Sequence, residues 1–201
     1  MKYCRMLQLL KKIFTILFKT YFYKMHYLIL DLDIDEIQQK LVDFNLSVKE
    51  LEYEDFLCGD SKVFNAFKLR SVLRRLNDGT HRAFGIIENG ELIYSTWISL
   101  EELSLPVNVK YKLASNEGLL EDSYCNKEAR GRGLHFNMNL FRISKLHELG
   151  KSRVIAIVMD GNAPAFSVQL KSGFRDVGTF HCGKIFGISF STLKQSSYES
   201  K

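Results

Sequence analysis

The sequence is poor in cysteine, in proline and in long uncharged apolar runs. Its four cysteines are far apart and form no Cys-x-x-Cys pair, so neither a disulfide framework nor a zinc site is indicated, and a reducing cytoplasm is the expected location. Two prolines and no low-complexity stretch argue against long disordered linkers. Lysines interrupt the N-terminal apolar run and no small-residue cleavage site follows it, so we expect neither a signal peptide nor a membrane-spanning helix.

The composition is that of one soluble domain with a short extension. The 201 residues are 46% apolar and 25% charged, which suffices for a real core. The net charge of +5 is concentrated at the N-terminus, where no acidic residue precedes Asp31. The rest of the chain is close to neutral, so its composition does not predict a nucleic-acid partner. The basic residues that carry the excess are Lys2, Arg5, Lys11, Lys12, Lys19 and Lys24.

Residues 1–24 predict a basic amphipathic helix, because apolar side chains recur every three or four positions beside the lysines. Two interpretations stay open. The helix lies on an anionic membrane surface, which would make the protein peripheral at the inner face of the membrane, or it packs on the domain or on a second copy in a homodimer. The apolar positions are Leu7, Leu10, Ile13, Phe14, Leu17, Phe18, Tyr21 and Phe22.

Residues 26–34 predict a short strand that carries three alternating aspartates, Asp31, Asp33 and Asp35 at its end. Three spaced carboxylates suggest a metal site. The glycine and the distal glutamate of a calcium loop are absent, so we expect no metal here.

The rest of the chain alternates strand and helix patterns. Asn89-Gly90 between two apolar runs predicts a hairpin of residues 82–88 and 92–99, and residues 100–116 are expected to form a loop. The order predicts an α/β (α+β) fold with helices against a mixed sheet. The other predicted elements are strands at 47–53, 118–126, 154–159, 174–182 and 184–190, the last two turning near Gly183, and helices at 54–76, 134–149 and 162–172.

Arg130-Gly131-Arg132-Gly133 stands between a predicted strand and a predicted helix. Glycines let the backbone approach a ligand, and the free amides and dipole of a helix start favour an anion. Such a turn can hold a phosphate or pyrophosphate, and the two arginines add positive charge. The Gly-Lys-Ser/Thr of a Walker A loop is missing, and the dinucleotide pattern fails at Phe136. By itself the turn is equally consistent with a tight connection.

Two segments together resemble the GNAT superfamily of acetyl-CoA-dependent acyltransferases. Glu128-Ala129-Arg130-Gly131-Arg132-Gly133 is similar to the family's Gln/Arg-x-x-Gly-x-Gly/Ala motif at the start of a helix. Asn162-Ala163-Pro164-Ala165 through Lys171-Ser172-Gly173-Phe174 is similar to its second signature, and the strand between them lies where the family has its splayed fifth strand. The resemblance is best over residues 118–180. It implies a GNAT-like mixed, mostly antiparallel sheet flanked by helices over residues 36–201, with residues 1–35 as an extension.

The resemblance implies acetyl-CoA as co-substrate and a primary amine that attacks the thioester directly. It assigns the pyrophosphate to the backbone amides of Arg130, Gly131, Arg132, Gly133 and Leu134. It assigns pantetheine to the backbone of Cys125, Asn126 and Lys127, with an amide near Cys125 on the acetyl carbonyl, and it places Asn162 and Phe166 along the arm near the thioester. Asn162 also suits a helix N-cap ahead of Pro164.

The sequence departs from the family at two positions. Glu128 replaces Gln or Arg in the first motif, where a carboxylate does little for an anion. Gln169 stands where the family often has a tyrosine that protonates the departing thiolate, and glutamine cannot act as that acid. Ser167 is the nearest hydroxyl in sequence, and water is an alternative. Many family members lack the tyrosine, since positioning of the amine does most of the work.

Glu121 is the candidate general base. It lies four residues before Cys125, on the same strand face by alternation, where family members often place a base or a water-holding residue. A partly buried carboxylate with a raised pKa would suit proton abstraction from an amine. Asp122 would point to the opposite face and is the weaker candidate. His135 and His181 are further alternatives, and a purely structural Glu121 stays open.

Three functions stay open. The first is an N-acetyltransferase whose acceptor is an amino sugar of a surface-polysaccharide pathway or, as the nearest rival, a peptide or protein amine. The second is a catalytically degenerate GNAT fold that binds CoA or a partner, which Gln169 and Glu128 favour. The third is a membrane-surface protein whose purpose lies in residues 1–24.

Overall fold

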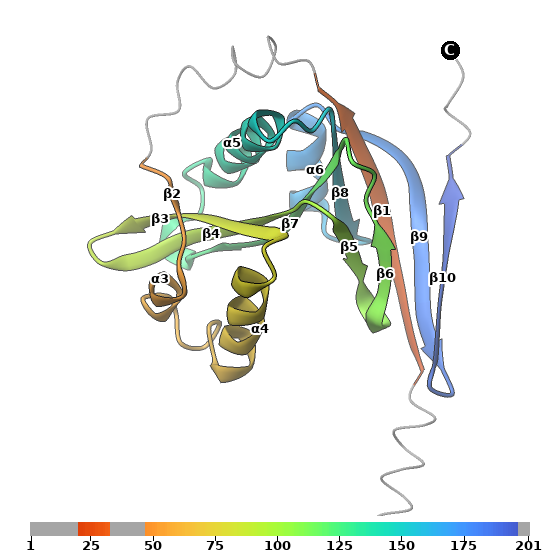
Figure 1. The fold of residues 1–201 in the computed structure, drawn as a ribbon, viewed down its shortest axis with the longest axis horizontal. Coiled ribbons are helices and arrows are strands. Elements are labelled where there is room, and N and C mark those ends of the chain that lie inside the picture. Colours follow the sequence, from red (N-terminus) through yellow and green to blue (C-terminus); the bar gives the residue numbers. More distant parts are fainter. Residues whose placement is uncertain (1–19, 33–46, 197–201) are drawn as a thin grey trace, which may run out of the picture.

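An eight-stranded sheet forms the centre of the computed structural model, which describes residues 20–32 and 47–196 (Figure 1). The strand order is β10-β9-β1-β8-β7-β4-β3-β2, and β5 and β6 form a separate hairpin. The strands are β1 Tyr21–Asp31, β2 Lys49–Glu50, β3 His81–Glu88, β4 Glu91–Ser99, β5 Glu102–Leu105, β6 Val109–Lys112, β7 Glu117–Cys125, β8 Arg153–Met159, β9 Arg175–Ile185 and β10 Ile188–Gln195.

Helices cover both faces of this sheet (Figure 1). α5 (Leu134–Glu148) and α6 (Ala163–Lys171) lie on one face, where Met138 and Leu146 join a core with Val154. α3 (Tyr53–Leu57) and α4 (Ala66–Asn77) lie on the other face, around a core that includes Trp97. The β5–β6 hairpin lies on that second face too, where a third cluster of buried side chains joins it to β1, β7, β8 and β9.

The sheet opens between β7 and β8. These two strands pair in parallel only over Glu117–Leu120 and Arg153–Ala156. Beyond that point β7 stays paired with β4 as far as Cys125, whereas β8 stays paired with β1 as far as Met159. The two halves of the sheet therefore diverge, and a gap opens between the ends of β7 and β8.

A bulge lies beside this gap. The β4–β7 register shifts between Ser95 and Trp97, and Asp122 on β7 adopts a φ of 36°. An extra residue in one strand ends the strict alternation of side chains between the two faces. Sequence spacing across residue 122 therefore no longer tells which face a side chain occupies.

The predicted fold class is confirmed: the sheet is mixed and mostly antiparallel, with helices on both faces. The hairpin β3–β4 turns at Asn89 and Gly90, which both have positive φ, 52° and 79°, as a two-residue hairpin turn requires. The predicted elements that became β7, α5, β8 and α6 are confirmed within two residues at each end.

Four predicted elements are wrong in detail. Residues 100–116 contain the β5–β6 hairpin, because Leu103 and Leu105 turn into the core. The helix predicted over residues 54–76 divides into α3 and α4, with Asn65 capping the second. The strand predicted at 47–53 shortens to β2. Gly183 lies inside β9, where a Cβ would come within 2.6 Å of the Tyr21 carbonyl oxygen, and the turn follows at residues 186–187.

β1 lies inside the sheet, between β8 and β9. Tyr21 and Phe22 therefore belong to a strand, and the predicted helix is wrong for residues 21–24; Tyr23, Met25 and Tyr27 face one core with a period of two. The predicted helix over residues 1–19, and the division between residues 35 and 36, lie outside the described residues. Among the helices that are described, none has the length and apolarity to cross a membrane.

Candidate active site

A cavity of about 460 Å³ occupies the gap between β7 and β8. The end of β7 and the end of β8 form two walls, the first turn of α6 closes a third, and β4 and α5 contribute from the α5 side of the sheet. The cavity therefore passes between strands that are hydrogen-bonded only at their beginnings. Side chains in its wall include Tyr94, Glu121, Cys125, His135, Arg142 and Asn162.

A second cavity, of about 800 Å³, lies over the glycine turn. Its wall includes Arg130, Gly131 and Gly133, together with Lys171 of α6. Both cavities have Cys125, His135 and Val168 in their walls, so they adjoin. Together they form one channel that leads from the glycine turn through the strand gap to Glu121.

The glycine turn is built for close approach of a ligand. Gly131 and Gly133 have φ of 81° and 72°, values that other residues adopt only with strain. A Cβ at Gly131 would meet no atom within 4 Å. Gly133 is the N-cap of α5, and no side chain caps that helix. The first-turn amides therefore point out of the helix with partial positive charge, as anion binding needs.

The charges around the turn differ from the sequence expectation. Arg132 forms a bidentate ion pair with Glu88, at 2.7 and 2.9 Å, so its charge is largely compensated. The Arg130 Nε donates to the carbonyl oxygen of Cys125 at 3.4 Å, and Arg130 borders the cavity. Lys171, to which no role was assigned from the sequence, supplies a further cation at this cavity. The turn therefore keeps a net positive character at Arg130 and Lys171.

The segment after β7 makes its own hydrogen bonds. The Asn126 side chain accepts from the Glu128 amide and donates to Glu91 at 2.6 Å, which fixes the short turn over Lys127–Ala129. Neither Asn126 nor Lys127 has a side chain in the wall of the two cavities, whereas Cys125 borders both. The pantetheine role predicted for these residues concerns their backbone and stays a prediction.

Asn162 and Phe166 lie at different places around α6. Asn162 is the N-cap of the helix, accepts from the Ala165 amide at 3.3 Å, and also borders the strand gap. The two roles considered for Asn162 are therefore compatible. Phe166 stacks near His26 of β1, with ring centroids 4.4 Å apart, and does not belong to the wall of either cavity.

Glu121 borders the gap on the α4 side of the sheet. Its Oε2 lies 3.6 Å from the guanidinium of Arg75 and 3.6 Å from Nε2 of His81. Only 10% of the side chain is exposed, and burial raises the pKa of Glu121, against the opposing effect of Arg75 and His81. A raised pKa together with a place in a cavity wall is what a general base for an amine needs.

The expected faces of Glu121 and Asp122 are wrong. Both carboxylates reach Arg75 of α4, Asp122 at 3.2 Å, whereas Cys125 packs on the α5 side. The bulge at Asp122 is the physical reason, because it changes the strand's alternation between Glu121 and Cys125. Asp122 also pairs with Lys68, so two cations hold its charge, and Glu121 stays the stronger candidate base.

Several solved structures are similar to this one in fold. A GNAT-family acetyltransferase from Novosphingobium aromaticivorans has a TM-score of 0.56 at 14% identity, over 89% of this chain and 68% of that one. A tandem GNAT protein from the clavulanic acid biosynthesis pathway has a TM-score of 0.59 at 18% identity, over 84% and 55%. The chain has the GNAT fold.

A third GNAT-fold structure is the aminoglycoside antibiotic 6'-N-acetyltransferase from Acinetobacter haemolyticus, with a TM-score of 0.50 at 13% identity, over 78% of this chain and 98% of that one. The chain thus spans only 55% of the tandem protein but nearly all of this shorter one. No family model matches the sequence. No curated protein sequence matches it either.

A buried polar network lies under the gap of this GNAT fold. Gln169, which the resemblance places where a tyrosine often stands, accepts a hydrogen bond of 3.0 Å from Asn139. Asn139 in turn accepts from Arg142, whose guanidinium also donates to the backbone carbonyl oxygens of Trp97 and Glu121 at 3.1 and 3.0 Å. Burial lowers the pKa of Arg142 to about 10, so it stays protonated at neutral pH. Gln169 therefore has a structural partner in the network.

Tyr94 and His135 form a second pair in the wall of the gap. The Tyr94 hydroxyl and His135 Nδ1 are 2.6 Å apart. Burial, and to a lesser extent Arg142, lower the pKa of His135 to about 4, so the imidazole is neutral at pH 7. We therefore assign His135 a hydrogen-bonding role in the wall of the channel. His181, the other alternative base, lies on β9 away from this channel, beside Lys24 and Lys194.

Arg75, His81, Tyr94 and Arg142 were not predicted as site residues. Arg142 could have been identified from the sequence, because it stands four positions from Met138 and from Leu146, on the buried stripe of α5. A charge on such a stripe needs a specific partner. Arg75 and His81 could not have been identified in this way, since only the packing of α4 and β3 against β7 brings them to Glu121.

Proposed function

We propose that the protein is an acetyl-CoA-dependent N-acetyltransferase that acts on a primary amine. One observation carries the proposal: a channel leads from an uncapped, glycine-built helix start, through the gap between β7 and β8, to a buried carboxylate. An anion site, a slot between strands and a base follow one another along it, which is the order that transfer from CoA to an amine requires.

The residues present fit acetyl-CoA. The amides of the first turn of α5, with Arg130 and Lys171 beside them, would hold the pyrophosphate. Cys125 and Asn162 border the slot that would take the pantetheine arm. When bound, acetyl-CoA supplies the thioester carbonyl that the amine attacks.

The acceptor would approach from the α4 side. A cavity of about 210 Å³ lies there between β7, β8 and the β5–β6 hairpin, with Glu121, Arg75 and Met159 in its wall. Glu121 also borders the strand gap, so an amine at this carboxylate would face a thioester held in the gap. Glu121 would take the proton that the amine loses, and the two reactants would be held in place by opposite faces of the sheet.

Departure of the thiolate would need no acid from α6. Gln169 donates no acidic proton and is engaged with Asn139, and Ser167 is exposed and does not border either cavity. A thiol has an ordinary pKa of about 8.5, so a thiolate is a tolerable leaving group at neutral pH. Catalysis by this chain would rest on positioning and on Glu121.

For the acceptor we propose an amino sugar, with a peptide or protein amine as the alternative. The name of the Acinetobacter neighbour, an aminoglycoside N-acetyltransferase, supports a sugar-borne amine. Cytoplasmic location, homodimer formation and contact of residues 1–24 with the inner face of the membrane stay predictions. Liposome sedimentation of the full chain and of the chain from Thr20 onward would test the membrane contact.

The proposed function is tested with purified protein, acetyl-CoA and a metabolite extract. We expect mass spectrometry to find acetylated amines that require the protein, together with release of free CoA. A metabolite panel of amino sugars and a panel of peptides, each at equal amine concentration, would then separate the two acceptor classes by kcat/KM. Tight binding of acetyl-CoA without turnover on any amine would instead support a degenerate fold, which the engagement of Gln169 favours.

A further inference from the structure

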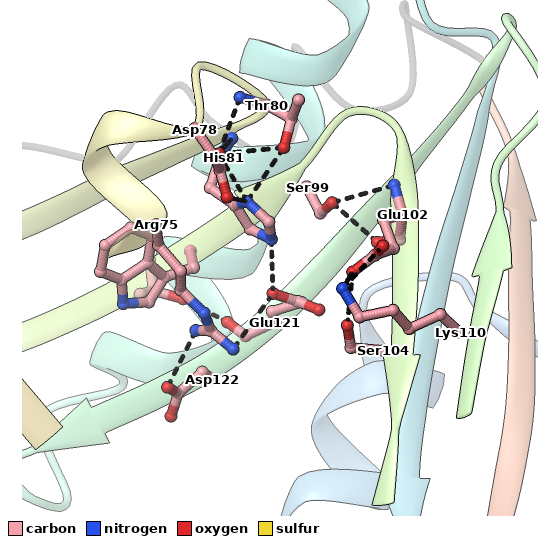
Figure 2. Close-up of polar contacts among 12 residues, drawn as sticks. Arg75, Asp78, Thr80, His81, Ser99, Glu102, Ser104, Lys110, Glu121 and Asp122 are labelled. Atoms are coloured by element: carbon pink, nitrogen blue, oxygen red, sulfur yellow. Dashed lines mark hydrogen bonds and ion pairs between the residues drawn. The ribbon is translucent and has the colours of Figure 1, made fainter. Parts of the chain in front are cut away.

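Glu121 is the end of a chain of polar contacts that reaches the surface (Figure 2). Asp78, just after α4, accepts hydrogen bonds from the amide and hydroxyl of Thr80, at 2.9 and 3.0 Å. The His81 Nδ1 lies 2.8 Å from Asp78 Oδ2, and Nε2 on the other side of the ring faces Glu121 Oε2 at 3.6 Å. The imidazole therefore stands between two carboxylates.

The contact with Asp78 determines which ring nitrogen of His81 carries the proton. A carboxylate accepts hydrogen bonds and donates none, so Nδ1 carries a proton that it donates to Asp78. In the neutral ring, Nε2 then has a free lone pair directed at Glu121. This is the orientation in which a histidine held by an aspartate accepts a proton from a third group.

The two oxygens of Glu121 have different surroundings. Oε2 is buried and has no hydrogen-bond partner among the described residues, and both Arg75 and His81 approach it (Figure 2). The side chain is 10% exposed, and this exposure belongs to its other atoms. Glu121 therefore borders two cavities while its Oε2 faces His81, so the side chain lies between a place for a substrate and a proton acceptor.

The outer end of these contacts, at Asp78, is more exposed than the rest. The side chains of Glu121 and His81 are 10% and 9% exposed, whereas Asp78 is 35% exposed. His81 and Asp78 also border a cavity of about 320 Å³ between the end of α4 and the β5–β6 hairpin. A proton on His81 is thus one step from water, while a proton on Glu121 Oε2 is not.

Charged groups from every neighbouring element surround this pair. Arg75 of α4 and Asp122 of β7 act on Glu121 in opposite directions, and Glu102 of β5 adds a weaker negative field that its partner Lys110 of β6 reduces. Arg75 is itself held by Asp122 at 3.2 Å and lies over the Trp97 ring. Arg142 of α5 is a further, buried cation that interacts with Glu121.

We propose that His81, oriented by Asp78, removes from Glu121 the proton that this carboxylate takes from the acceptor amine. This inference rests on the proposed function. The amine's N–H bond breaks as an O–H bond forms on the accessible oxygen of Glu121. Rotation of the carboxyl group brings this O–H to His81, and the O–H bond breaks as an N–H bond forms on Nε2. The imidazolium, stabilised by Asp78, gives the proton to water in the cavity beside it. His81 and Asp78 are positioning residues that return Glu121 to its ionised form.

The test compares His81→Gln, Asp78→Asn and the control His147→Gln, an exposed histidine on α5, with the wild type. The acceptor is the best amine of the panel. We expect His81→Gln to lower kcat roughly 10- to 100-fold, less than loss of the base itself, with acetyl-CoA affinity unchanged. Added imidazole should restore part of the rate of His81→Gln in proportion to its concentration, and should leave the wild type and His147→Gln unaffected.

The pH profile supplies a readout that a merely structural role would not move. While its ring is protonated, His81 opposes the rise of the Glu121 pKa, so His81→Gln should shift the acidic limb of kcat/KM to higher pH. Asp78→Asn keeps the ring but removes its orienting carboxylate, and should also lower kcat. An active wild type with unchanged kcat and pH profile in His81→Gln would overturn the relay alone. If His81→Gln does not fold, unchanged kcat in folded Asp78→Asn overturns it equally. Absence of turnover in the wild type would overturn the proposed function, and the relay with it.

Discussion

Arg142 on α5 donates a 3.0 Å hydrogen bond to the backbone carbonyl oxygen of Glu121 on β7. The same guanidinium donates to the carbonyl oxygen of Trp97 on β4, across the bulge that interrupts the pairing of these strands. The helix that begins at the glycine turn therefore also fixes the backbone of the candidate base. The proposed pyrophosphate site and the proposed base are held in one rigid unit, which suits a reaction that depends on positioning.

Arg142→Met should destabilise the protein strongly. The substitution keeps much of the side-chain volume but leaves the carbonyl oxygens of Trp97 and Glu121 buried without this donor, at a cost of about 1–3 kcal/mol for each group. Denaturant unfolding would measure the loss. The exposed Arg74 provides the control, because Arg74→Met should change the free energy of unfolding by no more than about 0.5 kcal/mol. Equal stability of the two variants would contradict the role given to Arg142.

Gly131→Glu should abolish binding of acetyl-CoA. The substitution places a carboxylate where the pyrophosphate would lie, and the repulsion adds to the loss of close backbone approach. Gly150→Glu is a matched control, since Gly150 has a φ of 76° against 81° and a Cβ there also meets open space. The backbone strain of the two variants is therefore comparable. Isothermal titration should find wild-type affinity in Gly150→Glu only; unchanged affinity in folded Gly131→Glu removes the pyrophosphate assignment.

Glu121→Gln should lower kcat by about 10²- to 10⁴-fold, the usual contribution of a positioned base, with little change in acetyl-CoA affinity. Glutamine has nearly the same shape but takes no proton. Glu148→Gln, on the exposed end of α5, serves as the control. Steady-state kinetics with the best amine of the panel, together with titration of acetyl-CoA, separate the chemical step from binding. Full activity of Glu121→Gln at neutral pH would exclude this residue as the base.

Arg75→Gln should move the acidic limb of the pH profile to higher pH. The base acts in its ionised form, so activity rises with pH through the pKa of Glu121. Burial already raises that pKa and Arg75 opposes the rise most strongly, so without the guanidinium the pKa of Glu121 should rise further. The profile of kcat/KM against pH measures it. Arg70→Gln, an exposed position on the same helix, should leave the limb where it is.

The parts of the molecule that depend on local sequence could be predicted. The hairpin turn at Asn89-Gly90 and the start of α5 after Gly133 could be predicted, because both need positive φ values, which asparagine and glycine adopt readily. The apolar run of β8 follows from burial on both sides. The 130–133 turn and Asn162 border the channel, while the cofactor contacts that the resemblance implies for them stay predictions.

The parts that depend on tertiary packing could not be predicted. The face of Glu121 was wrong because a bulge at Asp122 leaves no mark in the sequence. Arg75 and His81 reach Glu121 only through the docking of α4 and β3. Residues 26–34 were expected to form a strand, but residues 21–24 were expected to be helical, since over a few residues their apolar pattern fits both periods; the pairing of β1 with β8 and β9 shows that the strand already begins at Tyr21.

The place of β1 in the sheet also sets an order of events during synthesis. Its described partners are β8 and β9, and its ion pair with Arg153 joins residues 122 positions apart. β1 can therefore pair with its described partners only after β8 and β9 have been made, and such distant pairing is slow. The channel wall that β8 provides is therefore fixed by pairing between residues 122 positions apart.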